Sequence, residues 1–163
     1  MDWAHIVPMK RKVIRRETTK MRHINEAGID LIKSWEGCVL KPYQDEAGYW
    51  TIGWGHLIVE GENFSEITSE RADAILEVDL LQAESAVERL ISVPLTDNQF
   101  AALVSFTFNL GPGALERSTL RKVLNRGEYQ AAAEEFPKWC YAGGHKSAGL
   151  LKRRLEEGTL FLT

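Results

Sequence analysis

Cysteine, long hydrophobic runs and a recognisable secretory signal are scarce or missing in this sequence of 163 residues. The two cysteines, Cys38 and Cys140, lie 102 positions apart and outside any CxxC or Cys/His cluster, which excludes a disulfide-stabilised small domain. We expect reduced thiols, with a single long-range bridge as the alternative. The longest apolar runs, such as residues 100–104, fall far short of the ~18 residues that a membrane span needs. Because no basic segment is followed by an apolar core near the start, we expect no signal peptide.

The charge is distributed unevenly along an otherwise ordinary composition of 44% hydrophobic and 26% charged residues, with a net charge of -3. This composition is typical of a globular domain and excludes collagen-like or disordered chains. Residues 1–23 hold seven cations and two anions, a charge of +5, so the rest carries -8. We therefore predict a basic extension over 1–23 and one domain over 24–163. The extension either touches an anionic surface or is a solvated segment. A further alternative is that Met1 is an upstream start codon and that Met21 is the true start. Nucleic acid is not expected, because no aromatic residues lie among its basic ones.

Helical spacing of apolar residues dominates outside residues 38–60. The first predicted helix has Asn25 as its N-cap and Gly37 as its stop, so Glu36 lies at its end. Further helices are predicted over 69–93, 99–109, 118–125, 128–136 and 150–157. A capping box at Thr96 and Gln99 opens the helix over 99–109, which is apolar on almost all sides and should be buried.

Residues 38–60 are rich in glycine and aromatic side chains, and Tyr49–Trp54 reads as a strand. Trp50, Ile52 and Trp54 share one face, which we expect to pack on the core, while Thr51 lies on the opposite, more polar face. The sequence therefore predicts an α+β fold: a small antiparallel β lobe of two or three strands packed against a larger helical lobe. The cleft between two such lobes is the expected ligand site.

Glu36, Asp45 and Thr51 are the candidate chemical groups. Glu36 ends an apolar helix, where desolvation would raise the pKa of its carboxyl, as a general acid requires. Asp45 lies in a polar turn and is expected to stay ionised. Two carboxyls in such different environments suit glycoside hydrolysis, with the Thr51 hydroxyl orienting a water. Taken alone, this spacing is weak evidence, because Glu and Asp are common residues and two solvated surface acids would then be the favoured interpretation.

The stretch from Glu36 to His56 resembles the catalytic signature of the phage-type lysozymes, glycoside hydrolase family 24. That family places an aspartate nine positions after a glutamate and a threonine six further on, as at 36, 45 and 51. The resemblance continues through residues 95–111 and 143–156, and covers about 24–163. It implies an endolysin that hydrolyses the β-1,4 bond between N-acetylmuramic acid and N-acetylglucosamine in peptidoglycan. Glu36 would be the general acid, with Asp45 and Thr51 positioning water. A carboxyl separation of ~6.5–9.5 Å would indicate inversion, and ~5–5.5 Å a covalent intermediate.

The resemblance assigns further roles to individual side chains. Leu57, Phe108 and Thr119 match positions that bind sugar in relatives, although Leu57 and Phe108 are equally consistent with core packing. His56 is expected to be structural, because no second metal ligand lies at a suitable spacing. We therefore expect neither a metal nor a cofactor. Four basic side chains either contact acidic cell-wall groups or form a solvated face: His145, Lys146, Arg153 and Arg154.

Two other functions compete with hydrolysis. A lytic transglycosylase cleaves the same bond with a single glutamate, and Asp45 and Thr51 argue against it. A non-catalytic binding module would use the basic extension. For the hydrolase, we expect a monomer that acts on peptidoglycan glycan strands. It should accumulate in the bacterial cytoplasm until a holin-like protein permeabilises the membrane, and then act at the cell wall.

Overall fold

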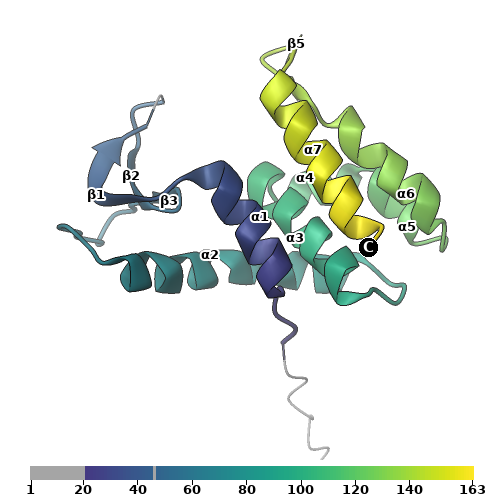
Figure 1. The fold of residues 1–163 in the computed structure, drawn as a ribbon, viewed down its shortest axis with the longest axis horizontal. Coiled ribbons are helices and arrows are strands. Elements are labelled where there is room, and N and C mark those ends of the chain that lie inside the picture. Colours follow the sequence, from purple (N-terminus) through teal and green to yellow (C-terminus); the bar gives the residue numbers. More distant parts are fainter. Residues whose placement is uncertain (1–20, 46) are drawn as a thin grey trace, which may run out of the picture.

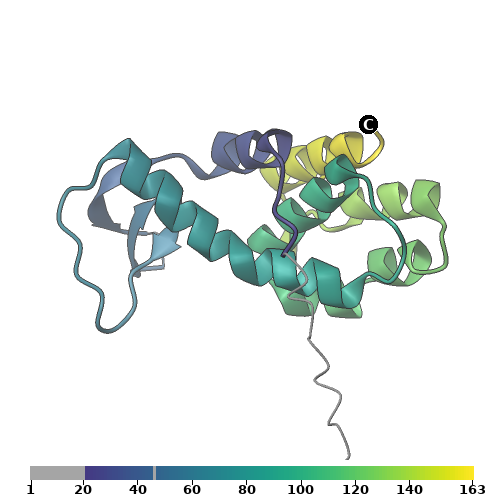
Figure 2. The same ribbon diagram turned by 90° about the horizontal axis from the view of Figure 1, so that it is seen from below.

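The computed structural model describes residues 21–45 and 47–163, so most of the predicted basic extension lies outside the described residues. Two lobes are joined by one long helix, α2, which runs from the sheet into the helical lobe (Figures 1 and 2). This confirms the predicted α+β architecture. The helices are α1 Glu26–Glu36, α2 Ser69–Leu90, α3 Asp97–Leu110, α4 Pro112–Arg117, α5 Thr119–Leu124, α6 Tyr129–Glu135, the 3-10 turn η1 Phe136–Lys138 and α7 Ala148–Phe161.

The β lobe is a three-stranded antiparallel sheet in the order β1-β2-β3, formed by Val39–Gln44, Trp50–Gly53 and His56–Leu57. Thr51 lies opposite Tyr43 on one side and Leu57 on the other. The prediction that Trp50 packs on the core is wrong, because Trp50 is 54% exposed, whereas Ile52 on the same strand is fully buried. Trp50 begins β2 near the tip of the hairpin, and this tip extends away from α2 (Figure 1).

Helix α3 is the centre of the core, as its apolar composition predicts. All residues from Phe100 to Thr107 are buried, and α1, α2 and α7 pack against it. The predicted capping box is present: the Thr96 hydroxyl accepts from the Gln99 amide, and the Gln99 side chain accepts from the Thr96 amide. Helix α1 approaches α3 closely at Gly28, where an added Cβ would lie 2.7 Å from the Cβ of Ala101.

Two elements differ from the sequence prediction. Pro112 and Gly113 are residue types that usually interrupt a helix, but Pro112 is the first residue of α4. The backbone N–H that proline lacks has no partner within a helix at this first position. Tyr141–Ala142 and His145–Lys146 form a short hairpin, β4-β5, ahead of α7. Within the described residues, no helix is both long and apolar enough to span a membrane.

Candidate active site

A cleft of about 520 Å³ lies where the two lobes meet. Glu36 at the end of α1 is part of its wall, together with residues 55–57 of the β lobe. Helices α2 and α3 supply the other side, including Phe108 and Asn109. The fold therefore brings Glu36, Leu57 and Phe108, which are far apart in the sequence, to one concave surface.

Glu36 is held at the edge of this cleft by a buried arginine. Its Oε1 accepts a hydrogen bond of 2.7 Å from Nη1 of Arg153, and 22% of its side chain is exposed. Gly55 borders the other carboxylate oxygen: a Cβ there would lie 3.4 Å from Oε2, and its φ of +86° disfavours any side chain. Glu36 is thus anchored on one side and open to the cleft on the other.

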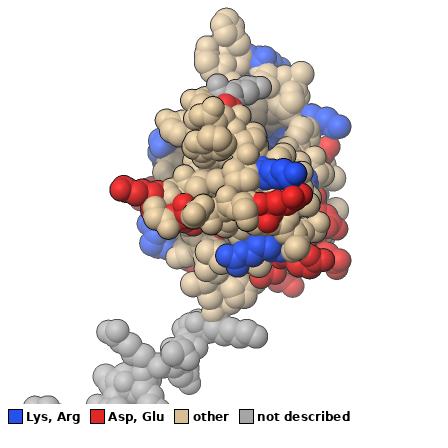
Figure 3. Space-filling model, turned by 90° about the vertical axis from the view of Figure 1, so that its left-hand side faces the viewer, with Lys and Arg blue, Asp and Glu red and all other residues tan. Residues whose placement is uncertain are grey.

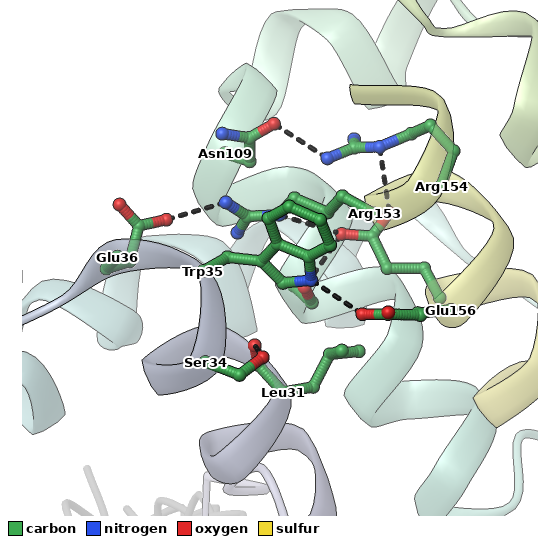
Figure 4. A network of polar contacts seen from close by, with 10 residues as sticks. Leu31, Ser34, Trp35, Glu36, Asn109, Arg153, Arg154 and Glu156 are labelled. Atoms are coloured by element: carbon green, nitrogen blue, oxygen red, sulfur yellow. Dashed lines mark hydrogen bonds and ion pairs between the residues drawn. The ribbon is translucent and has the colours of Figure 1, made fainter. Parts of the chain in front are cut away.

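Arg153 belongs to a charged network inside the helical lobe (Figure 4). Glu157 Oε1 accepts from Ser105 Oγ at 2.8 Å and from Arg153 Nε at 3.4 Å. Glu157 Oε2 forms an ion pair of 3.2 Å with Nε of Arg154, without hydrogen-bond geometry. Burial raises the pKa of Glu157 and lowers the pKa of Arg154, while their mutual attraction opposes both shifts.

This network corrects one of our interpretations. The sequence suggests that Arg153 and Arg154 either contact acidic cell-wall groups or belong to a solvated face, but they are only 4% and 0% exposed. Both point inward because their partners, Glu36, Asn109 and Glu157, line the space between α1, α3 and α7. His145 and Lys146, in contrast, are exposed on the β4-β5 hairpin.

Asp45 and Thr51 are connected through the backbone of Tyr49. Asp45 Oδ1 accepts from the amides of Ala47 and Tyr49, each at 2.9 Å. The Tyr49 carbonyl accepts from the Asp45 amide at 2.9 Å and from the Thr51 hydroxyl at 3.2 Å. The turn therefore fixes the Asp45 carboxylate and the Thr51 hydroxyl relative to each other.

The remaining predicted site residues occupy different places. Thr51 is buried, and its strand neighbour Leu57 is half-exposed in the cleft. Opposed residues of an antiparallel pair project from the same face of the sheet, so Thr51 lies on the face that carries Leu57. Thr119 is exposed at the first turn of α5 and is not among the cleft-lining residues, and neither are Asp45 and Thr51.

His56 connects the β lobe to α2 at the cleft. Its Nδ1 lies 2.9 Å from Asp79 Oδ2 on α2, and its Nε2 lies 3.0 Å from Glu62 Oε2 in the loop after β3. Burial on its own would lower the pKa of His56, but the hydrogen bonds and charges of Glu62 and Asp79 outweigh burial and raise it. These contacts join the β3 residue His56 to the loop that follows it and to α2.

We expect the stabilisation that His56 provides to depend on pH. Because its pKa is raised in the folded protein, the contribution is fully present below the unfolded value of about 6.5 and is lost as the pH rises through the folded value. Urea titrations should therefore show that His56→Gln lowers the free energy of unfolding by a larger amount at pH 6 than at pH 9. His145→Gln, on the exposed hairpin, is the control. An equal deficit at both pH values would contradict this role.

The sequence indicates no site role for Asn109, and it suggests Arg153 only as a contact for acidic cell-wall groups, not as a partner of Glu36. Asn109 lines the cleft, and its Oδ1 accepts a hydrogen bond of 2.7 Å from Arg154 Nη2. Its position directly after Phe108 was the only local signal. Nothing in the local sequence around Arg153 indicates its contact with Glu36, 117 positions away.

Comparisons with known proteins identify the family of this chain. The phage lysozyme family model matches residues 33–157. An endolysin of Acyrthosiphon pisum secondary endosymbiont phage 1 is 45% identical over 144 residues, which cover 85% of this chain and 97% of that protein. An endolysin of Bacillus phage B103 is 46% identical over 86% of this chain, which spans only 54% of that longer relative. A crystal structure of a lysozyme mutant from phage P22 superposes with a TM-score of 0.80 at 41% identity, covering 88% of this chain and 100% of that one. The chain therefore belongs to the phage lysozyme family.

Proposed function

We propose that Glu36 is the general acid, and that Asp45 and Thr51 activate and orient water, in hydrolysis of the β-1,4 bond between N-acetylmuramic acid and N-acetylglucosamine. A phage lysozyme is a glycoside hydrolase that degrades bacterial peptidoglycan in host cell lysis. The observation that carries the assignment is the Glu36 carboxyl at the junction of the two lobes, anchored by Arg153 and facing the cleft.

In this mechanism, Glu36 donates its proton to the glycosidic oxygen as the bond to the anomeric carbon breaks. Arg153 then stabilises the carboxylate that remains, because a charge-assisted hydrogen bond strengthens when its acceptor becomes ionised. Water attacks the anomeric carbon and passes a proton to Asp45, while the Thr51 hydroxyl orients it. Direct attack by water inverts the configuration at that carbon. One glycosidic bond and one water are consumed, and a new hemiacetal and a new hydroxyl are formed.

Mass spectrometry of digested sacculi tests hydrolysis against its two alternatives. Hydrolysis leaves reducing ends that each contain the added water. A lytic transglycosylase would leave 1,6-anhydro ends that are lighter by one water, and this result would overturn the mechanism. A binding module would release no fragments at all. From the β-lobe end, the surface shows cations and carboxylates side by side instead of a single-sign patch (Figure 3), which does not favour binding through charge alone on this face.

The substrate lies outside the cytoplasmic membrane, so access to it is the second part of the proposal. We propose that the chain reaches the cell wall after a holin-like protein has permeabilised the membrane. Cells that express this chain alone are then expected to stay turbid until their membrane is permeabilised with chloroform, and to clear afterwards. Clearing without any permeabilisation would contradict this dependence and leave the hydrolytic mechanism untouched.

A further inference from the structure

Asn109 presents an oriented amide to the cleft. It lies near the end of α3, lines the cleft and is exposed. Its Oδ1 is occupied by the 2.7 Å hydrogen bond from Arg154 (Figure 4). Because the amide group is planar and its oxygen faces Arg154, the two N–H donors of Nδ2 face away from that arginine. Among the described residues, none accepts a hydrogen bond from Nδ2.

Arg154 is held so that it contacts no solvent. It is fully buried, paired with Glu157 at 3.2 Å, and its guanidinium lies 5.3 Å from the ring centre of Phe106. A guanidinium has only donors, so it can bind the oxygen of Asn109 but never its nitrogen. Without this contact, the side-chain amide of an exposed asparagine could rotate by 180°, which exchanges the positions of its oxygen and nitrogen.

We propose that Arg154 is a positioning residue, which fixes the Asn109 amide so that Nδ2 donates a hydrogen bond to a carbonyl oxygen of the bound glycan. This inference rests on the proposed function and deepens it. Peptidoglycan offers such a carbonyl in two places, the acetamido group of each sugar and the lactyl-peptide arm of the muramic acid. If the Asn109 amide were flipped, its Oδ1 would face the carbonyl oxygen of the glycan, and two acceptors would meet without a hydrogen. Fixing the orientation of the amide therefore improves binding of this carbonyl.

Steady-state kinetics on solubilised glycan test this with a double-mutant cycle of Asn109→Ala, Arg154→Lys and the double variant. Losing one hydrogen bond should raise KM by roughly 3- to 10-fold and leave kcat within about twofold. Arg154→Lys should raise KM in the wild-type background and should have no further effect when Asn109 is already alanine. An equal effect of Arg154→Lys on KM in both backgrounds would show that Arg154 only stabilises the fold, and would overturn the proposal.

Asn109→Asp keeps the test decisive if Arg154→Lys does not fold. Aspartate has the same shape and still accepts from Arg154, but it lacks the N–H donors. It should therefore raise KM as Asn109→Ala does, and a wild-type KM would overturn the proposal.

Peptide-free glycan strands and intact strands identify the carbonyl. A raised KM of the Asn109 variants on both substrates indicates the acetamido group, and a raised KM on intact strands alone indicates the peptide arm. If the wild type releases no reducing ends, the proposed function fails. If the wild type does release reducing ends and Asn109→Asp has the same KM as the wild type, this inference alone fails.

Discussion

Replacing Glu36 with glutamine should lower the rate of peptidoglycan cleavage by about 10²- to 10⁴-fold, the range that general acid catalysis contributes. Glutamine keeps the shape of the side chain and an oxygen that can accept from Arg153, but it has no acidic proton to give to the leaving sugar. Clearing of chloroform-permeabilised Gram-negative cells measures the effect. Binding to sacculi should persist, because the cleft walls are unchanged.

Asp30→Asn is the matched control for this variant. Asp30 lies on the same helix and is exposed, away from the cleft-lining residues, so removing its charge should leave clearing within about twofold, as is usual for exposed positions. If Glu36→Gln clears cells as fast as Asp30→Asn, the general acid is another group. Thermal unfolding of both variants checks that a loss of activity is not a loss of folded protein.

Local signals were sufficient for the helices that frame the cleft. The Asn25 side chain caps α1 by accepting from the Gly28 amide, and the chain leaves this helix at Gly37 with φ of +65°. Both features depend on residues within one turn of each other, so the sequence could indicate them. The same is true of Asp45 and Thr51, whose contacts with Tyr49 span only a few residues.

The anchoring of Glu36 could not be predicted in this way. The cluster of charges at 152–157 has the appearance of an exposed helix face, because Lys, Arg and Glu spaced by three or four residues are common on helix surfaces. Whether such a face is buried depends on what packs against it. Here Asn109 and Ser105 lie 45 and 52 positions away, on α3, and only the three-dimensional fold brings them to α7.

Removing the centre of this cluster should have a large effect on stability. Glu157→Ala is expected to lower the free energy of unfolding by about 3–5 kcal/mol, because it leaves two buried guanidinium groups without their shared carboxylate. Urea titration measures the loss. Glu134→Ala on α6 removes an exposed carboxylate and should change stability by no more than about 0.5 kcal/mol.

The cost of breaking the cluster is not the same as the stability that the cluster provides. Burial raises the pKa of Glu157 in spite of its two arginine neighbours, which indicates that attraction does not fully offset the loss of solvation. Replacing all three charges at once, with Arg153→Met, Arg154→Met and Glu157→Leu, should therefore recover most of the stability that Glu157→Ala loses. Apolar side chains of similar volume need no solvation and fill the same space.

Activity should nevertheless stay low in this triple variant, because Glu36 and Asn109 both lose the arginines that hold them. Folded but inactive protein would mean that evolution kept buried charges here to position cleft groups, at no net gain in stability. A triple variant that is both stable and as active as the wild type would show that Glu36 needs no anchor. A triple variant that stays as unstable as Glu157→Ala would show instead that the ion pairs themselves hold α7 against α3.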